Sequence, residues 1–276
     1  MKKKQTITRL LIALGLLILL FFMLVPLYWA VVLSFDKTAV NRLPDFSWWP
    51  HQPSMYNYDA LHYFIDVPQY YKNTVFLTVV NTAISVFFAL TAGYAFAKGR
   101  FVLKKFWYYV LLAVMMIPFE SRMIPLYMIY YNMGLINTYW PLIFGQFAYV
   151  YGIFFARTFI MGIPDSLREA AKVDGASEWR IYLTIILPLC KPIAATLCIL
   201  QAIAHWNNYL WPLIVVKDYS KQVISVGVAL FSASVDAVYY GPRMALAVIS
   251  AVPLIIIFLF LQKYIVQSIA VSGIKQ

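Results

Sequence analysis

Polar side chains recur on one face of an apolar segment near residue 205. Gln201, His205 and Asn208 are spaced at i, i+4 and i+7, which places them in one stripe if the segment is helical. Trp206 and Trp211 add two aromatic rings. Amides suit the hydroxyls of a sugar, and aromatic rings suit its apolar C–H faces. The stripe predicts a solute path or, as the alternative, hydrogen bonds to a neighbouring helix.

A second polar pair interrupts the apolar run between Phe106 and Tyr131. Glu120 and Arg122 are two residues apart, so in a regular helix they point to different faces and do not pair. Two interpretations stay open. Either both residues line a polar cavity near an outer gate, or Pro118 ends the helix and they lie at the outer membrane interface.

The residue types needed for enzyme chemistry do not occur at useful spacings. Neither paired carboxylates nor a nucleophile with its base are found, so we expect no catalytic residue. No Cys and His cluster has metal-ligand spacing, and we interpret Cys190 and Cys198 as small apolar helix residues. No glycine is followed by Lys and then Ser or Thr, so the chain lacks its own phosphate-binding loop. We therefore expect no metal and no bound cofactor.

The elements that must position these side chains are membrane helices. Of the 276 residues, 63% are hydrophobic and 12% are charged, which is more apolar surface than a soluble core would bury. A helix crosses about 30 Å of hydrocarbon with about 20 residues. Apolar runs of that length lie near residues 10–35, 74–97, 106–128, 137–156, 192–216 and 243–266. We predict an all-α, polytopic membrane protein with six transmembrane helices.

The basic residues orient this bundle. The chain has 22 Lys and Arg against 11 Asp and Glu. With the N-terminus inside, most of the basic residues fall in cytoplasmic segments, namely Lys2, Lys3, Lys4, Arg9, Lys98, Arg100, Lys104, Lys105, Arg157, Arg168, Lys172, Arg180, Lys191, Lys263 and Lys275. The positive-inside rule therefore favours two cytoplasmic termini. Because these residues are spread between apolar runs, we expect membrane lipid and no nucleic acid as a partner.

The predicted inner loop, residues 157–191, carries clear helical signals. Ser166 followed by Glu169 is a capping-box pattern, so we expect a short helix from Leu167 to about Asp174. Gly175 then fits the left-handed position that ends a helix.

A second helix is expected directly after this turn. Ser177 can cap it, and it continues through Trp179 and Tyr182 toward Pro188. Small side chains leave a surface that a partner could approach closely, at Ala170, Ala171 and Ala176. The helix, tight turn and helix predict a docking site. The alternative is an ordinary connector.

The sequence of this loop resembles that of a known family. EAAKVDGA (169–176), followed by ILP (186–188), is similar to the signature loop of permease subunits in bacterial ATP-binding-cassette importers. WNNYLWPL (206–213) resembles the fifth-helix segment of the maltose-type carbohydrate permeases. The resemblance covers residues 70–276.

The resemblance implies the type I importer fold. Residues 1–72 would form the N-terminal tail, first helix and outer excursion, 73–266 the type 1 transmembrane domain, and 267–276 a cytoplasmic tail. In this family the inner loop fits a groove on a cytoplasmic ATPase. The matching residues here are Glu169, Ala170, Ala171, Asp174, Gly175 and Ala176.

The resemblance also implies a set of partners in the bacterial inner membrane. These are a second homologous permease, two cytoplasmic ATPase subunits that use ATP and Mg²⁺, and an extracytoplasmic solute-binding protein that delivers a sugar or oligosaccharide. Permeases of this family also import glycerol phosphate esters, although no phosphate-binding cluster is evident in the crossings. An ion-coupled secondary transporter is the alternative of a different class, but Glu120 is the one acidic residue inside a predicted crossing.

Overall fold

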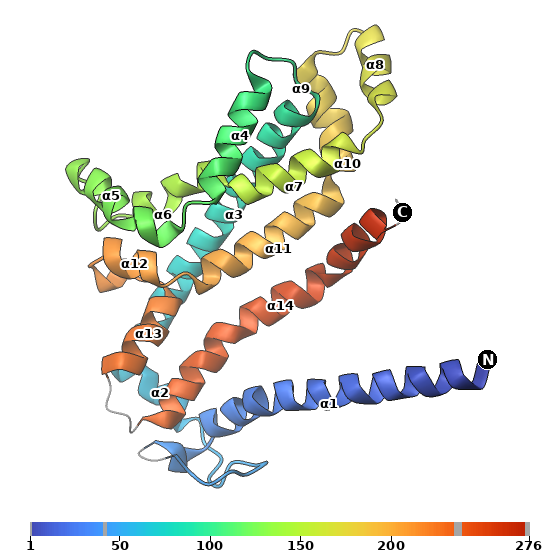
Figure 1. Ribbon diagram of the computed structural model, residues 1–276. Coiled ribbons are helices and arrows are strands. Elements are labelled where there is room, and N and C mark those ends of the chain that lie inside the picture. The colour runs from blue at the N-terminus through green and yellow to red at the C-terminus, as the bar shows by residue number, and fades with distance from the viewer. Residues whose placement is uncertain (1, 41–42, 235–238, 274–276) are drawn as a thin grey trace. The chain divides into compact units, whose positions relative to one another are not determined.

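The computed structural model describes residues 2–40, 43–234 and 239–273 (Figure 1). The chain divides into two compact units. The first comprises Met1–Val67 and Gly227–Pro253, and the second comprises Pro68–Val226 and Leu254–Gln276.

The first unit contains α1 (Lys2–Ser34), η1 (Lys37–Ala39), α2 (Tyr56–Ala60), η2 (Leu61–Tyr63), most of α13 (Ile224–Ser234) and the first part of α14 (Tyr240–Gly273). The side chains of Asn57 and Asp36 organise the segment after α1. The Asn57 amide donates hydrogen bonds to the carbonyls of Leu33, Ser34 and Asp36, at 2.9–3.1 Å, and so satisfies carbonyls that the end of a helix leaves free. A Cβ added to Gly241 would lie 2.4 Å from this amide, so glycine permits the close approach of α14.

The Asp36 carboxylate is buried and accepts five hydrogen bonds. They come from the backbone N–H and hydroxyl of Thr38, the backbone N–H and Nδ1 of His51, and the backbone N–H of Gln52, at 2.7–3.2 Å. Burial by itself raises the pKa of Asp36, but the hydrogen bonds from His51 and Thr38 outweigh it and hold the pKa far below its usual value. The segment after α1 is therefore ordered around an ionised carboxylate.

The second unit is built from helices. They are α3 (Val67–Lys98), α4 (Lys104–Met115), α5 (Phe119–Asn132), α6 (Trp140–Phe144), η3 (Gly145–Ala148), α7 (Val150–Met161), α8 (Asp165–Val173), α9 (Glu178–Ile181), the π-helical η4 (Tyr182–Ile186), α10 (Leu187–Leu189), α11 (Lys191–Asn207), α12 (Leu210–Val215), η5 (Tyr219–Lys221), the start of α13 and the second part of α14.

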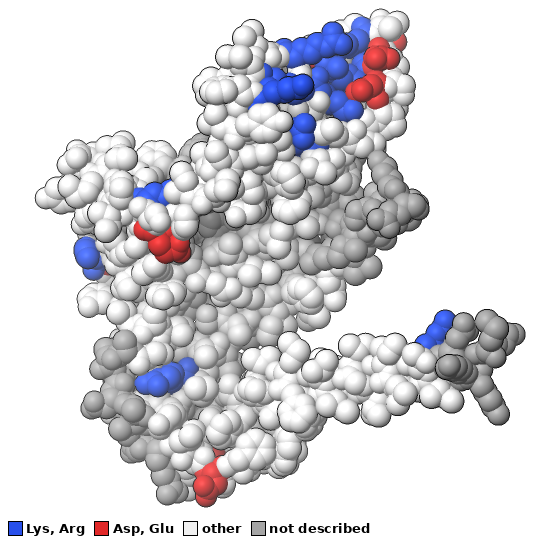
Figure 2. Space-filling view, in the orientation of Figure 1, with Lys and Arg blue, Asp and Glu red and all other residues white. Residues whose placement is uncertain are grey.

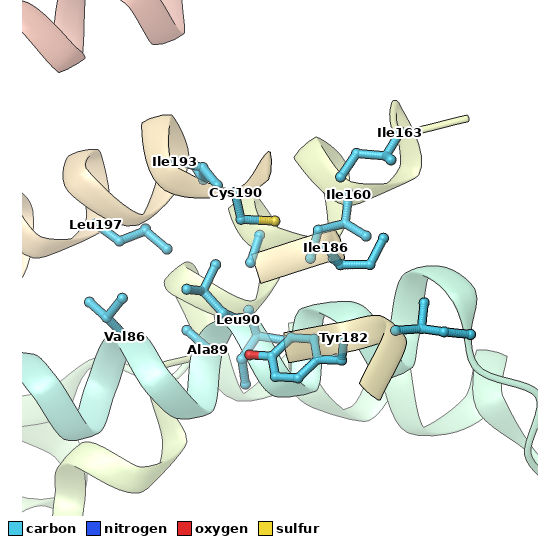
Figure 3. Packing of buried hydrophobic residues seen from close by; sticks show 13 residues of the cluster. Val86, Ala89, Leu90, Ile160, Ile163, Tyr182, Ile186, Cys190, Ile193 and Leu197 are labelled. Carbon is cyan, nitrogen blue, oxygen red and sulfur yellow. The ribbon is translucent and has the colours of Figure 1, made fainter. Parts of the chain in front are cut away.

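Its apolar core joins α3, α7, the run from α9 to α10, and α11 (Figure 3). Leu90, Ile160, Tyr182 and Ile186 are each at most 3% exposed. The backbones of α3 and α7 approach closely, because a Cβ added to Gly93 would lie 2.6 Å from the Cβ of Ala156. The inner loop is therefore attached to a packed core and not to a flexible linker.

The structure gives four to six candidate crossings in its described residues, against the six that were predicted. Within the described residues, Thr6–Ser34, Val67–Lys98, Trp140–Met161 and Tyr240–Phe260 are long and apolar enough to span a membrane. Two further candidates are bent pairs, Lys104–Met115 with Phe119–Asn132 at 99°, and Glu178–Leu189 with Lys191–Asn207 at 75°. Counting each bent pair as one span gives six.

The third predicted crossing, near residues 106–128, is divided into two helices, which is one of the two interpretations left open for Pro118. Helix α4 ends at Met115 and α5 begins at Phe119, after Pro118. Proline has no N–H to donate and disfavours helical backbone in Ile117, so the apolar run divides there. At the other end of the chain, the expected tail 267–276 lies in α14 as far as Gly273, and residues 274–276 lie outside the described part of the chain.

Candidate functional site: the inner loop and a small polar cavity

The first helix of the inner loop, α8, begins earlier than its capping-box pattern predicts. It starts at Asp165, and the residue before it is Pro164, whose side chain makes no capping hydrogen bond. Ser166 therefore lies inside the first turn, and the predicted cap by Ser166 and Glu169 was wrong. Pro164 takes the cap position with a ψ of 134°, outside the helical region, and Asp165 provides the negative charge that favours a helix N-terminus.

The turn after α8 has the predicted geometry. Gly175 has a φ of +77°, in the left-handed region. The N–H of Gly175 donates to the carbonyl of Lys172 at 3.0 Å, and the N–H of Ala176 donates to that of Ala171 at 2.9 Å. These bonds close the end of α8. Nothing lies within 4 Å of a Cβ added to Gly175, so backbone conformation and not space requires glycine here.

The second helix also begins as predicted. The Ser177 hydroxyl accepts a hydrogen bond from the N–H of Arg180 at 3.3 Å, and the chain continues through α9, η4 and α10 to Leu189. The predicted docking residues lie on both sides of the turn. Glu169, Ala170, Asp174 and Gly175 are exposed, whereas Ala171 and Ala176 are half-buried against the core.

Charged side chains gather over the end of the second unit that carries α8 (Figure 2). Lys98, at the end of α3, lies 2.8 Å from a carboxylate oxygen of Asp165 and donates to the carbonyl of Ile163 at 2.7 Å. The hydrogen bond and the charge of Lys98 lower the pKa of Asp165. Sequence reasoning missed both Asp165 and Lys98, because 67 positions separate them and no local signal pairs them.

The predicted solute-path residues divide into two sets. Gln201, Trp206 and Trp211 are buried at 6%, 2% and 4% exposure. The ring of Trp206 meets the ring of Tyr71 edge to face at 5.5 Å. The Nε1 of Trp211 donates to the carbonyl of Pro141 at 3.0 Å. The structure thus places the two tryptophan rings in packing contacts within the second unit.

His205 and Asn208 form the other set, because both line one cavity of about 20 Å³. Its lining consists of Thr74, Leu77, Asn81, Leu142, His205, Asn208, Pro212 and Val223. The Nε2 of His205 and the Oδ1 of Asn81 are buried without a hydrogen-bond partner. A volume of this size holds about one water molecule. The cavity therefore presents free polar atoms to any small group that enters it.

Asn208 does not continue the helical stripe as expected. Helix α11 ends at Asn207, and Asn208 has extended backbone, with φ −70° and ψ 114°. Pro212 has no N–H to bond the carbonyl of Asn208, and the Ser225 hydroxyl donates to that carbonyl instead, at 2.7 Å. Asn208 lines the same cavity as His205 because the chain leaves the helix after Asn207, and not because of helical spacing.

Glu120 and Arg122 lie in the first turns of α5 and both are exposed. The Arg122 guanidinium lies 5.8 Å from the centre of the Phe119 ring. Helix α4 ends before Pro118, as the interface interpretation requires, and the location of both residues at a membrane interface stays a prediction.

Comparisons with known proteins identify the family of this chain. The family described as a binding-protein-dependent transport system inner membrane component matches residues 85–271. The arabinooligosaccharides transport system permease protein AraQ of Halalkalibacterium halodurans is 34% identical over 206 residues, which cover 75% of this chain and 74% of AraQ. The lactose transport system permease protein LacG of Rhizobium radiobacter is 34% identical over 203 residues, which cover 74% of each chain.

A solved structure has the same fold over nearly the whole chain. It is a crystal structure of a bacterial ABC transporter involved in the import of the acidic polysaccharide alginate. A chain of that transporter is 25% identical and superposes with a TM-score of 0.81, which covers 94% of this chain and 96% of the other.

Proposed function

Since the chain belongs to the family of binding-protein-dependent transport inner membrane components, the permease subunits of ATP-binding-cassette importers, we propose that it forms half of the pore of an oligosaccharide importer. It is a multi-pass membrane transport subunit and not an enzyme. The observation that carries the proposal is the exposed turn at Gly175, which ends α8 and lies on a helix pair packed against the core.

The energy source is a separate ATPase that docks on this turn. The chain has no phosphate-binding loop, so ATP and Mg²⁺ are used by the partner. Glu169, Ala170, Asp174 and Gly175 form the contact surface, because all four are exposed, and the small Ala170 and Gly175 allow close approach.

Movement of the docked loop shifts the bundle between inward-open and outward-open states. Such a shift needs an element with two arrangements that the partner binds unequally. The bend of 75° between the α9–α10 run and α11 supplies a candidate, because the π-helical η4 lies in the same run, separated from the bend by α10. π-Helical turns are rare and occur frequently at functional sites.

The cargo is a sugar or oligosaccharide. Relatives named for arabinooligosaccharide and lactose transport support this class. The cavity of His205 and Asn208 supplies polar groups of the kind that bind hydroxyls. The family description supports a binding protein that delivers the solute. The full assembly contains a second permease and two ATPase subunits, and both termini of this chain face the cytoplasm, which the distribution of Lys and Arg supports.

Uptake by the reconstituted complex tests this function. The chain is co-expressed with the permease, ATPase and binding protein, and the complex is placed in vesicles that contain ATP or a non-hydrolysable analogue. We expect uptake of labelled oligosaccharide with ATP and the binding protein together, and background uptake when either is left out. Uptake driven by an ion gradient without ATP would contradict the proposal and favour a secondary transporter.

A further inference from the structure

The carboxylate of Glu178 connects three elements of the second unit. It accepts a hydrogen bond from the Tyr94 hydroxyl of α3 at 2.8 Å and from the Nη2 of Arg168 in α8 at 2.7 Å. Lys172, also in α8, forms an ion pair with the same group. Glu178 itself opens α9. We call these four residues the Glu178 cluster.

The Glu178 cluster lies directly against the packed core. The ring of Tyr94 stacks on the ring of Tyr182, with centroids 5.3 Å apart and planes 30° apart. Tyr182 is 1% exposed and is the first residue of η4, which leads through α10 into α11. A displacement of α8 therefore reaches α3 through the Tyr94 hydroxyl and reaches α11 through the chain that begins at Glu178.

The Glu178 cluster fixes the orientation of helices and adds little to the free energy of folding. The side chains of Glu178 and Lys172 are 49% and 45% exposed, and exposed ion pairs contribute little to the free energy of folding. Arg168, in contrast, is only 16% exposed, and its Nε and Nη2 both bond the carboxylate, at 3.3 and 2.7 Å. A two-point bond of this kind fixes the orientation of one helix against another.

We propose that Glu178 is a positioning residue that transmits the displacement of α8 to α3 and α11 during transport; this rests on the proposed function, in which an ATPase moves α8. Its partner in α3 is the hydroxyl of Tyr94. The contact of Lys98 with Asp165 is a separate connection between α3 and α8, and it leaves α8 anchored at its start when the Glu178 cluster is broken.

The test measures oligosaccharide imported per ATP hydrolysed by the complete reconstituted complex. Glu178→Gln and Tyr94→Phe should each lower this ratio by about threefold. The first weakens the bonds that the Glu178 carboxylate accepts, and the second removes the bond that the Tyr94 hydroxyl donates to it. The ATPase subunits should still co-purify with both variants. Arg180→Gln is the matched control, because Arg180 is an exposed charged residue of the same short helix, and it should leave the ratio unchanged.

The double variant separates transmission from folding. If Glu178 and Tyr94 act as a unit, Tyr94→Phe causes no further loss in the Glu178→Gln background. Tyr94→Phe keeps the stacked ring, so it remains a valid test if Glu178→Gln fails to fold. An unchanged ratio in Tyr94→Phe, additive losses, or loss of the ATPase from Glu178→Gln would each overturn the assignment. Failure of the wild-type complex to import with ATP would instead overturn the proposed function.

Discussion

At the scale of single residues, burial separates the polar and aromatic groups of the fifth predicted crossing. Trp206 and Trp211 fill space between helices, and their partners Tyr71 and Pro141 lie far away in sequence. Spacing alone therefore identified a polar region but did not distinguish packing residues from cavity residues. We propose Asn208 as the candidate for solute contact, because it lines the polar cavity from an extended backbone; a sugar would need the cavity, which holds about one water molecule, to widen.

Replacing Asn208 with Ala should change the rate or selectivity of transport with little effect on assembly. The amide is lost from the cavity, and the backbone carbonyl that bonds Ser225 remains. Asn207→Ala is the control, because Asn207 is adjacent and exposed. Competition among several labelled oligosaccharides measures the effect. If Asn208→Ala transports every one of them like the wild type, Asn208 is not part of the path.

Acidification should destabilise the segment after α1 through Asp36. Its folded pKa lies far below the unfolded value of about 3.9, so its contribution to stability is fully present above about pH 4 and falls progressively as the pH drops from there toward the folded pKa. Hydrogen exchange of residues 36–40 and 51–54 from pH 3 to 7 measures this. Asp36→Asn should exchange faster at pH 7 and show less pH dependence. Asp59→Asn, which alters an exposed carboxylate of the same segment, should behave as the wild type.

At the scale of elements, local signals predicted some helix ends and failed at others. Gly175 and Ser177 act through their own backbone and hydroxyl, so their roles were readable from the sequence. The start of α8 was not readable in this way, because the cap residue is Pro164, two residues before the expected Ser166. The Glu178 cluster was also missed, because Tyr94 is 84 positions away from Glu178.

The crossing of α3 and α7 depends on Gly93. A methyl group there would lie 2.6 Å from the Cβ of Ala156 and 2.9 Å from the backbone nitrogen of Arg157, so Gly93→Ala should cost about 1–3 kcal/mol. The melting temperature of the purified complex in detergent measures this cost. Gly15→Ala adds the same group to α1 with nothing within 4 Å and should not lower the melting temperature. Equal melting temperatures for the two variants would contradict the close approach.

At the scale of the whole molecule, composition and apolar runs predicted an all-helical membrane protein, and the fold of the family agrees. The run lengths did not show that two of the six candidate spans are bent pairs. Those bends depend on prolines and on contacts between distant helices, which a hydropathy pattern does not contain. One of the bends, between Leu189 and Lys191, lies at the end of the proposed docking loop.

The central claim is that the turn at Gly175 couples ATP hydrolysis in a partner to transport by this chain. Gly175→Ala and Gly134→Ala are a matched pair, because both glycines have positive φ, +77° and +68°, and neither has an atom within 4 Å of an added Cβ. Left-handed backbone costs a residue with a side chain roughly 1–2 kcal/mol, so alanine introduces strain of the same order at both sites.

The deciding measurement is the number of oligosaccharide molecules imported per ATP hydrolysed by the reconstituted complex. We predict that Gly175→Ala lowers this ratio while the chain still inserts in the membrane, and that Gly134→Ala keeps the wild-type ratio. Equal ratios for Gly175→Ala and the wild type would contradict the claim that this turn couples hydrolysis to transport.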